Sequence, residues 1–371
     1  VATVEPQGLQ EFSVVFTDRS LKHMSAVYQQ VMRDISEMLK EVYNAQGVAL
    51  VPGGGTYGME SVARQFGHDA HAMIVRNGWF SYRWSQIFEA GGFASKTTVF
   101  KARQTGNGPQ APFAPAPVEE VVAMILEAKP DVVFAPHVET SAGLILPEDY
   151  ITALASAAHE VGALMVLDCI ASGCVWVDME KTGVDVLISA PQKGWSASPS
   201  AGLVMMSDRA MQRLDNTESD SFALDLKKWR AIMKAYEDGG HAYHATMPTD
   251  ALRAFRDTMQ ETRDYGFDKL KEAQWALGDG VRAMLAEKGV TSVAAEGFGA
   301  PGVVVSYTDD PDIQNGKKFA AEGMQIAAGV PLACDEPEGF MTFRLGLFGL
   351  DKLYDTGATL ARLKAVLDKV L

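Results

Sequence analysis

An aspartate and a lysine each follow an apolar run of the chain, and their types suit covalent catalysis. Asp168 closes the run 163–167, and a second run, 185–189, leads to Lys193. Both runs have the composition of buried strands, so we expect their ends at the same edge of a sheet, where open α/β sheets bind ligands. A lysine amine held there can form a Schiff base, and a nearby carboxylate can keep a pyridinium nitrogen protonated. Those are the two groups that pyridoxal phosphate chemistry requires of a protein.

A glycine-rich segment, Gly53 to Gly58, lies between a predicted strand and a predicted helix. Its backbone and the helix N-terminus suit a phosphate group, and Thr56 can cap the helix or donate its hydroxyl. A tight turn with a cap would also account for the segment taken alone. The segment satisfies G-x-G-x-x-G as well, and the next predicted strand ends at Arg76, which would suit the 2′-phosphate of NADP. An NADP-dependent dehydrogenase is therefore an alternative, although it leaves Asp168 and Lys193 unexplained.

The elements that must position these residues alternate between helix and strand. Apolar periodicity predicts helices at 25–43, 59–66, 118–129 and 147–161, and strands at 47–51, 72–75, 131–135, 163–168, 185–189 and 202–206. Such alternation predicts an α/β fold, with a mainly parallel sheet covered on both faces. Long helices at 251–289, strands at 303–307 and 340–345, and a helix at 357–371 predict a smaller α+β unit. We therefore expect an N-terminal segment (1–22), a large domain (23–250) and a small C-terminal domain (251–371).

The composition excludes several classes of function. The 371 residues are 47% hydrophobic and carry a formal charge of −14, which argues against binding to nucleic acid or to anionic membranes. The sequence contains no apolar run long enough to span a membrane, and residues 1–7 lack the pattern of a secretion signal. Cys169, Cys174 and Cys334 form no paired framework, which predicts free, buried thiols, no metal site and a cytoplasmic location.

Seven short motifs occur in an order that resembles one enzyme family. They are Asp168 with Ile170, Gln192-Lys193, Gly54-Gly55-Thr56, the segment 77–83 (Asn-Gly-Trp-Phe-Ser-Tyr-Arg), the segments His137-Val138-Glu139-Thr140 and Tyr243-His244-Ala245-Thr246-x-Pro248, and Phe343 to Gly349. From about residue 20 onward the chain resembles class V aminotransferases of pyridoxal phosphate (PLP) fold type I, most of all the alanine–glyoxylate and serine–pyruvate aminotransferase group. The resemblance implies a three-layer PLP-binding large domain followed by a smaller α+β domain.

The resemblance also implies roles for individual residues. Lys193 would carry the cofactor, Asp168 would contact the pyridine nitrogen, and Phe80 and Ile170 would pack against the ring. Gly54, Gly55, Thr56 and Gln192 would bind the phosphate, and Thr140 would face the cofactor. Tyr243 and Thr246 would reach the phosphate in a neighbouring subunit, which implies a homodimer with shared sites.

The expected reaction is transamination between a small amino acid (of the alanine, serine, glycine or aspartate type) and a small 2-oxo acid such as glyoxylate or pyruvate. Arg344 would bind the substrate carboxylate, with Arg19 and Arg83 as the other candidates. Because an arginine inside an apolar strand is costly to leave unpaired, we expect a carboxylate next to Arg344. The region 12–20 lacks the Gly-Pro loop usual in the family, which leaves the substrate open. Lyase or decarboxylase chemistry on the same cofactor is the alternative reaction.

Overall fold

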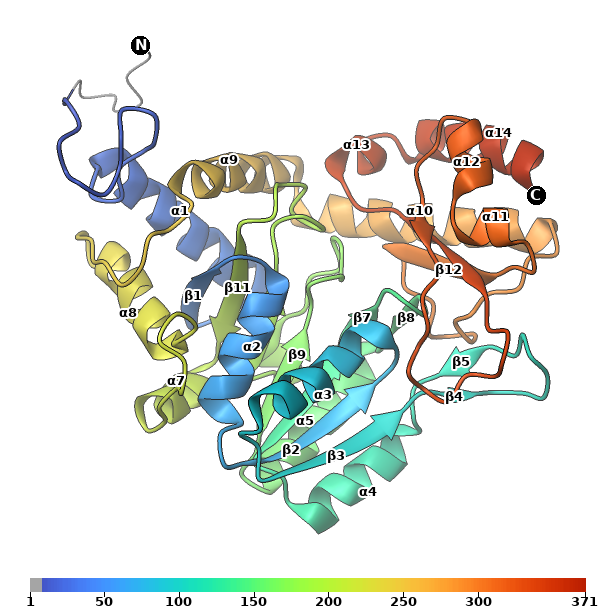
Figure 1. Ribbon diagram of the computed structural model, residues 1–371, viewed down its shortest axis with the longest axis horizontal. Helices are drawn as coiled ribbons and strands as arrows, with labels where there is room; N and C mark the ends of the chain where they lie inside the picture. Colours follow the sequence, from blue (N-terminus) through green and yellow to red (C-terminus); the bar gives the residue numbers. More distant parts are fainter. Residues whose placement is uncertain (1–8) are drawn as a thin grey trace.

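A seven-stranded sheet organises most of the chain in the computed structural model, which describes residues 9–371 (Figure 1). The strand order is β1-β11-β10-β9-β6-β2-β3. Six strands run in one direction, and β11 runs in the opposite direction. The prediction of a mainly parallel sheet is thus confirmed. The strands are β1 (Gly47–Pro52), β2 (His71–Arg76), β3 (Lys96–Lys101), β6 (Val132–Pro136), β9 (Leu164–Asp168), β10 (Val186–Ser189) and β11 (Ala201–Met206).

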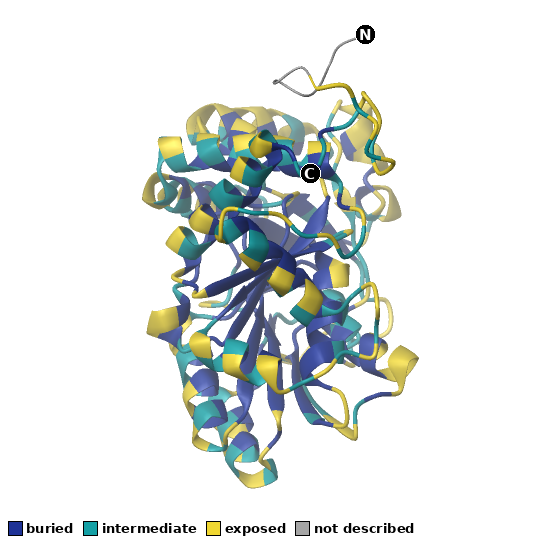
Figure 2. Ribbon diagram, turned by 90° about the vertical axis from the view of Figure 1, so that its left-hand side faces the viewer, coloured by how far each residue is buried: buried dark blue, intermediate teal, exposed yellow. Residues whose placement is uncertain are grey.

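Helices cover both faces of this sheet. Every residue of β6, β9, β10 and β11 is buried, because Val, Leu, Ile, Met and Ala side chains on both sides of these strands pack against helices (Figure 2). The helices of this part are α1 (Ala26–Tyr43), α2 (Gly55–Phe66), α3 (Trp79–Gly91), α4 (Val118–Ala128), α5 (Glu148–Glu160), α6 (Met179–Thr182), α7 (Asp208–Asp215), α8 (Leu226–Glu237) and α9 (Thr249–Tyr265). No helix within residues 9–371 is long and apolar enough to cross a bilayer. The expectation for residues 1–7 lies outside the described residues.

Residues 267–371, here called the C-terminal unit, form a second, smaller arrangement of helices packed on a sheet. An apolar cluster lies between these helices and strands. An antiparallel sheet of order β12-β14-β13 packs beside the long helix α10. Its elements are α10 (Phe267–Glu287), β12 (Val303–Tyr307), α11 (Pro311–Gln314), α12 (Lys317–Ala321), β13 (Ala327–Ala328), β14 (Thr342–Gly346), α13 (Leu350–Leu353) and α14 (Thr356–Val370). Two short pairs, β4 (Arg103–Gln104) with β5 (Phe113–Ala114) and β7 (Val138–Glu139) with β8 (Leu144–Ile145), lie in loops after β3 and β6.

The strand order decides against the dinucleotide interpretation of the glycine segment. A dinucleotide fold places its first two strands beside each other, so that the acidic or basic residue after the second strand reaches the ribose. Here β11, β10, β9 and β6 lie between β1 and β2. Arg76, the last residue of β2, is therefore remote from the glycine segment after β1, and the alternative of an NADP-dependent dehydrogenase is wrong.

Candidate active site

Asp168 and Lys193 lie at one edge of the large sheet, as their positions after two strands predict. Asp168 is the last residue of β9, and Ile188 of the parallel strand β10 is its partner in register. Lys193 follows in the turn after β10. Both residues face a cavity of about 180 Å³, which is lined by Gly55, Thr56, Met59, Phe80, Arg83, Val138, Thr140, Asp168, Ile170, Ala171, Gln192 and Lys193.

Burial dominates the electrostatics of Asp168. The residue is 7% exposed, and desolvation raises the pKa of its carboxyl group to about 7, while the Ile170 N–H, which donates to Oδ1 at 2.9 Å, opposes this shift. Glu139 raises the pKa of Asp168 further, and Arg83 and Lys193 lower it. A carboxyl group in this environment ionises more readily when a cation is placed beside it. A protonated pyridine nitrogen is a cation of this kind.

The amine of Lys193 is electrostatically suited to act as a nucleophile and a base. Burial lowers its pKa, the guanidinium groups of Arg344 and Arg83 lower it further, and Asp168 acts in the opposite direction. A lower pKa increases the fraction of neutral amine at a given pH, and the neutral amine is the reactive form. The ring of Phe348, a residue without a predicted role, lies 5.2 Å from Nζ.

The N-terminus of α2 lies at one end of the cavity. The helix begins at Gly55, with Gly54 as its N-cap, so the first-turn N–H groups are left without partners inside the helix. A Cβ atom on Gly55 would lie 2.6 Å from Ile170 Cδ1, so a larger residue here would have to displace the Ile170 side chain from the cavity wall. Thr56 does not cap the helix as expected. Its Oγ1 instead accepts a hydrogen bond at 3.0 Å from Arg83 Nη1, because the helix begins at Gly55 and Thr56 already lies inside its first turn.

The position of Phe80 depends on the buried carboxylate of Glu139, for which the motif predicted no role. Glu139 is fully buried and accepts hydrogen bonds from the N–H groups of Phe80 (3.2 Å) and Ser81 (2.8 Å) at the start of α3. The hydroxyl groups of Ser81 and Ser141 also donate to it, each at 2.7 Å. A carboxylate at a helix N-terminus stabilises the helix. Here that contact also fixes the residue whose ring lines the cavity.

Arg344 lies beside the cavity, on the C-terminal unit. It lies in the centre of β14, and its Cζ is 5.6 Å from the centroid of the Phe80 ring. The expected carboxylate partner is not found among residues 9–371. Instead Nε donates to the carbonyl oxygen of Ala328 at 2.8 Å. Burial lowers the pKa of Arg344, while Glu139 raises it. The terminal nitrogens are thus left for another anion.

Two predicted cofactor contacts are not brought to this cavity within one chain. Tyr243 and Thr246 lie in the loop before α9, where the Tyr243 hydroxyl and Thr246 Oγ1 are 2.9 Å apart. Tyr243 is 54% exposed.

Gly54 is the N-cap of α2 and does not line the cavity wall. Phe348 and Glu139 are added to the predicted set by the structure, and Arg83, named only as an alternative carboxylate-binding residue, lines the cavity.

Comparison with known proteins agrees with the fold and the cavity. The structure of an alanine–glyoxylate aminotransferase from Nostoc sp. superposes with a TM-score of 0.79 at 20% identity, covering 95% of this chain and 89% of that chain. The chain therefore has the architecture of the fold type I PLP enzymes. A family model described as Aminotransferase class-V matches residues 9–318, and the chain belongs to the class V aminotransferase family. It is a PLP-dependent aminotransferase.

Two relatives cover most of the chain. It is 24% identical, over 93% of its length and 86% of the relative, to a protein named soluble hydrogenase, small subunit, from Synechococcus sp.. It is 26% identical, over 90% of its length and 86% of the relative, to a 2-aminoethylphosphonate–pyruvate transaminase from Paraburkholderia phymatum.

The residues of the cavity fit the cofactor. The helix N-terminus with its glycine cradle suits a phosphate, the buried Asp168 suits a protonated ring nitrogen, and the amine of Lys193 suits an aldehyde. All three groups face the same space, with an arginine of the C-terminal unit beside it.

Proposed function

We propose that the protein transfers the amino group of a small amino acid to a small 2-oxo acid such as glyoxylate or pyruvate. The observation that carries this proposal is the cavity shared by Asp168 and Lys193, with the guanidinium of Arg344 near its Phe80 wall. The rings of Phe80 and Phe348 lie 5.6 Å from the guanidinium carbon of Arg344 and 5.2 Å from Nζ of Lys193, respectively. Aromatic rings this close to the proposed carboxylate-binding and reacting groups favour substrates with short side chains.

Each residue has one task in this proposal. When bound, PLP supplies an aldehyde that bonds to amines and a ring that accepts electrons from the substrate. Asp168 holds a proton on the ring nitrogen, and Lys193 moves the proton from the substrate α-carbon to C4′ of the cofactor. Phe80 and Ile170 confine the ring, and Thr140 contacts it. Gly54, Gly55, Thr56 and Gln192 bind the phosphate. Arg344 binds the carboxylate of both the amino acid and the oxo acid with two parallel hydrogen bonds.

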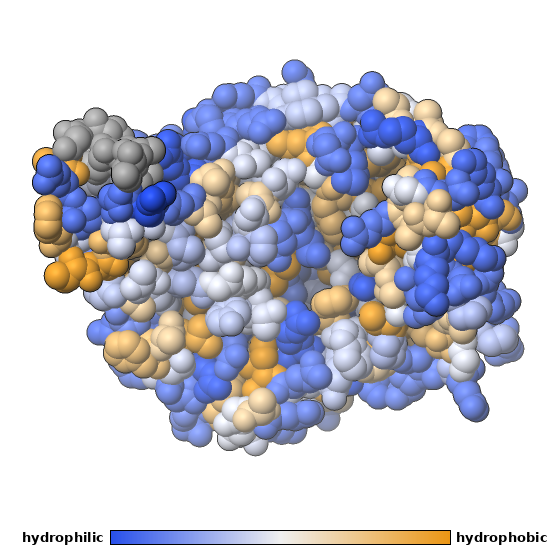
Figure 3. All heavy atoms as spheres, turned by 45° about the horizontal axis from the view of Figure 1, so that its top comes forward, coloured by the Kyte–Doolittle hydropathy of each residue, from blue (hydrophilic) through white to orange (hydrophobic). Residues whose placement is uncertain are grey.

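We also propose that two chains share each site. Tyr243 and Thr246 lie away from their own cavity, on an exposed loop. Phe12 and Val14 of the N-terminal segment are 85% and 100% exposed, and Figure 3 shows hydrophobic atoms gathered beside the grey residues of this segment. Exposed apolar side chains of this kind favour an interface with another chain. A homodimer in which Tyr243 and Thr246 reach the partner's phosphate accounts for both observations. The three free, buried cysteines support a reducing compartment such as the cytoplasm.

An amino-donor screen with purified protein tests the proposed reaction. Alanine, serine, glycine, aspartate and 2-aminoethylphosphonate are offered with glyoxylate or pyruvate, and both products are quantified. The proposal expects product formation that requires an oxo acid and is lost in Lys193→Ala. Turnover of an amino acid at the same rate without any oxo acid would instead establish a lyase or decarboxylase. Borohydride treatment followed by peptide mapping should place the cofactor on Lys193, and labelling of another lysine would refute its role.

A further inference from the structure

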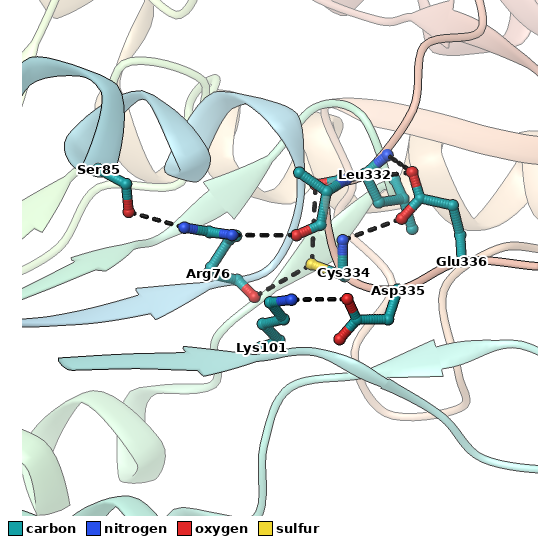
Figure 4. Close-up of polar contacts among 8 residues, drawn as sticks. Arg76, Ser85, Lys101, Leu332, Cys334, Asp335 and Glu336 are labelled. Atoms are coloured by element: carbon teal, nitrogen blue, oxygen red, sulfur yellow. Dashed lines mark hydrogen bonds and ion pairs between the residues drawn. The ribbon is translucent and has the colours of Figure 1, made fainter. Parts of the chain in front are cut away.

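Arg76 contacts the C-terminal unit and not a nucleotide site. It is the last residue of β2 and is 8% exposed. A loop of the C-terminal unit, Leu332 to Glu336, lies over it (Figure 4). Here this loop is called the clasp loop. Arg76 Nη1 donates to the carbonyl oxygen of Ala333 at 3.2 Å.

Two further contacts hold the clasp loop to the ends of β2 and β3. The Cys334 thiol donates to the carbonyl oxygen of Arg76, with 3.4 Å between sulfur and oxygen. Lys101 Nζ and Asp335 Oδ1 form an ion pair at 2.6 Å. Both residues of this pair are accessible to solvent, so the ion pair contributes little. Among the polar contacts, the buried ones of Arg76 are therefore the stronger, and they act beside the apolar cluster that Leu332 and Cys334 share with Ala102 and Phe113.

The surroundings of Arg76 point to a geometric role rather than to an ion pair. Within residues 9–371 it forms no salt bridge, and its Nε has no hydrogen-bond partner. Nη2 donates to Ser85 Oγ at 2.7 Å, and Cζ lies 4.4 Å from the centroid of the Tyr82 ring. Ser85 and Tyr82 belong to α3. The rigid fork of the guanidinium thus joins α3 to the clasp loop, which a single flexible amine cannot do.

Hydrogen bonds within the clasp loop fix its conformation independently of Arg76. The carboxylate of Glu336 accepts the N–H groups of Leu332 (2.7 Å), Ala333 (3.1 Å) and Cys334 (2.9 Å). Burial acts to raise the pKa of Glu336, but these N–H donors outweigh it and hold the pKa below its ordinary value. Ala333 and Asp335 adopt positive φ angles of 59°, which is uncommon for residues other than glycine. The carbonyl of Ala333 is therefore presented in a defined direction.

The clasp loop also connects the two strands that hold Arg344. It runs between β13, whose Ala328 carbonyl accepts the Nε of Arg344, and β14, which carries Arg344 itself. On the other side, α3 carries Phe80, whose ring lies 5.6 Å from the same guanidinium. Arg76 thus touches both segments that meet at Arg344.

We propose that Arg76 is a positioning residue which clasps the Leu332–Glu336 loop onto β2 and α3 and so sets the place of Arg344 for the substrate carboxylate. The inference rests on the proposed role of Arg344 as the carboxylate-binding residue. Removing the fork leaves the PLP contacts intact, because Arg76 is not part of the cavity wall. It loosens the C-terminal unit and lowers the affinity for carboxylates.

Steady-state kinetics of Arg76→Met test the clasp. We expect KM for the amino acid and the oxo acid to rise by about tenfold each, as the loss of a hydrogen bond to a charged group predicts. The kcat value, the affinity for PLP and the visible absorbance should stay near those of the wild type. The inhibition constant of acetate, a carboxylate that cannot react, should rise by the same factor as KM. Arg103→Met is the matched control, because the hydrogen bonds and ion pair of the Arg103 side chain within residues 9–371 are with Glu120 and are exposed, so no constant should change.

The outcomes separate the clasp from the proposed function. If Arg344→Lys raises both KM values but Arg76→Met does not, the clasp is wrong and the carboxylate site stands. If Arg344→Lys leaves KM and the acetate constant unchanged, the carboxylate site is wrong and the clasp falls with it. A joint loss of PLP affinity, kcat and thermal stability in Arg76→Met, without a selective rise in KM, would mark Arg76 as structural. If Arg76→Met does not fold, Ser85→Ala removes one contact of the same guanidinium and should raise both KM values by about threefold; unchanged values would refute the clasp.

Discussion

At the scale of single residues, burial and the neighbouring guanidinium groups of Arg83 and Arg344 together set the pKa values of Asp168 and Lys193. Asp168 is buried and its pKa is raised, while Lys193 has a lowered pKa because of burial and the neighbouring Arg344 and Arg83. The lowered pKa of Lys193 increases the fraction of neutral amine at neutral pH, which suits it to proton transfer. When PLP is bound, its protonated pyridine nitrogen places a cation beside the carboxylate of Asp168.

The raised pKa of Asp168 predicts a pH-dependent stability of the cofactor-free protein. Its carboxyl group has a pKa of about 7 in the folded chain and about 3.9 in an unfolded one. The folded state therefore binds more protons between these values, so the stabilising effect is complete below pH 4 and is lost as the pH rises through 7. The loss for this group is on the order of 4 kcal/mol.

Urea unfolding of cofactor-free wild type and Asp168→Asn from pH 4 to pH 8 checks this prediction. The stability of the wild type relative to the variant should fall as the pH rises. His137, whose pKa burial lowers to about 3, destabilises the protein towards low pH in both variants and cancels in the difference. A difference that does not vary with pH would show that Asp168 ionises freely in the empty site.

At the scale of elements, the site is assembled where the carboxyl ends of parallel strands meet a helix N-terminus. The direction of β1 matters here: β11 is antiparallel to both β1 and β10, so β1 runs parallel to β10 and its glycine loop reaches the same edge. The position of α2 on this edge depends on Gly58 and Gly202. Their backbones approach each other so closely that a Cβ on Gly202 would lie 2.6 Å from Gly58 Cα.

Gly202→Ala should therefore move α2 and weaken the phosphate site. We expect a loss of stability of about 1–3 kcal/mol, as overpacking against backbone atoms predicts, together with a lower affinity for PLP. Chemical denaturation and PLP titration of the cofactor-free protein measure both effects. Gly106→Ala is the control, because its new Cβ would meet Ala111 Cβ at 3.7 Å, an ordinary contact. Unchanged PLP affinity in Gly202→Ala would mean that α2 does not set the phosphate site.

At the scale of the whole molecule, the local charge of the site opposes the net charge of the chain. The chain carries a formal charge of −14, yet Arg83, Arg344 and Lys193 meet at the cavity, with Arg76 in the clasp. Carboxylate substrates are therefore attracted by the site and not by the rest of the surface. The second chain of the proposed homodimer would add Tyr243 and Thr246 to each site.

Mixing two impaired variants tests whether sites are shared. Lys193→Ala and the double variant Tyr243→Phe/Thr246→Ala should each have low activity at limiting PLP. In a mixed dimer, one site would combine an intact Lys193 with an intact Tyr243 and Thr246 from its partner. Random exchange of subunits should restore about a quarter of the wild-type activity, because half of the dimers are mixed and each has one intact site.

Lys193→Ala mixed with Asp168→Asn is the control, since both residues belong to the same chain's cavity and no intact site can form. If the first mixture recovers no more activity than this control, Tyr243 and Thr246 do not act across an interface.

Local patterns in the sequence are enough to place residues at the ends of strands and helices. Apolar runs and periodicity are local signals, so they placed Asp168, Lys193 and the glycine segment correctly, and motif order indicated the family. Strand order is not a local property, because it follows from how helices and strands pack over the whole chain. Only the tertiary structure separated β1 from β2, brought Arg344 to Phe80 and Phe348 to Lys193, and gave Glu139 its place under α3. It also turned Arg76 towards Ala333, 257 positions away in the sequence, a contact that no local pattern predicts.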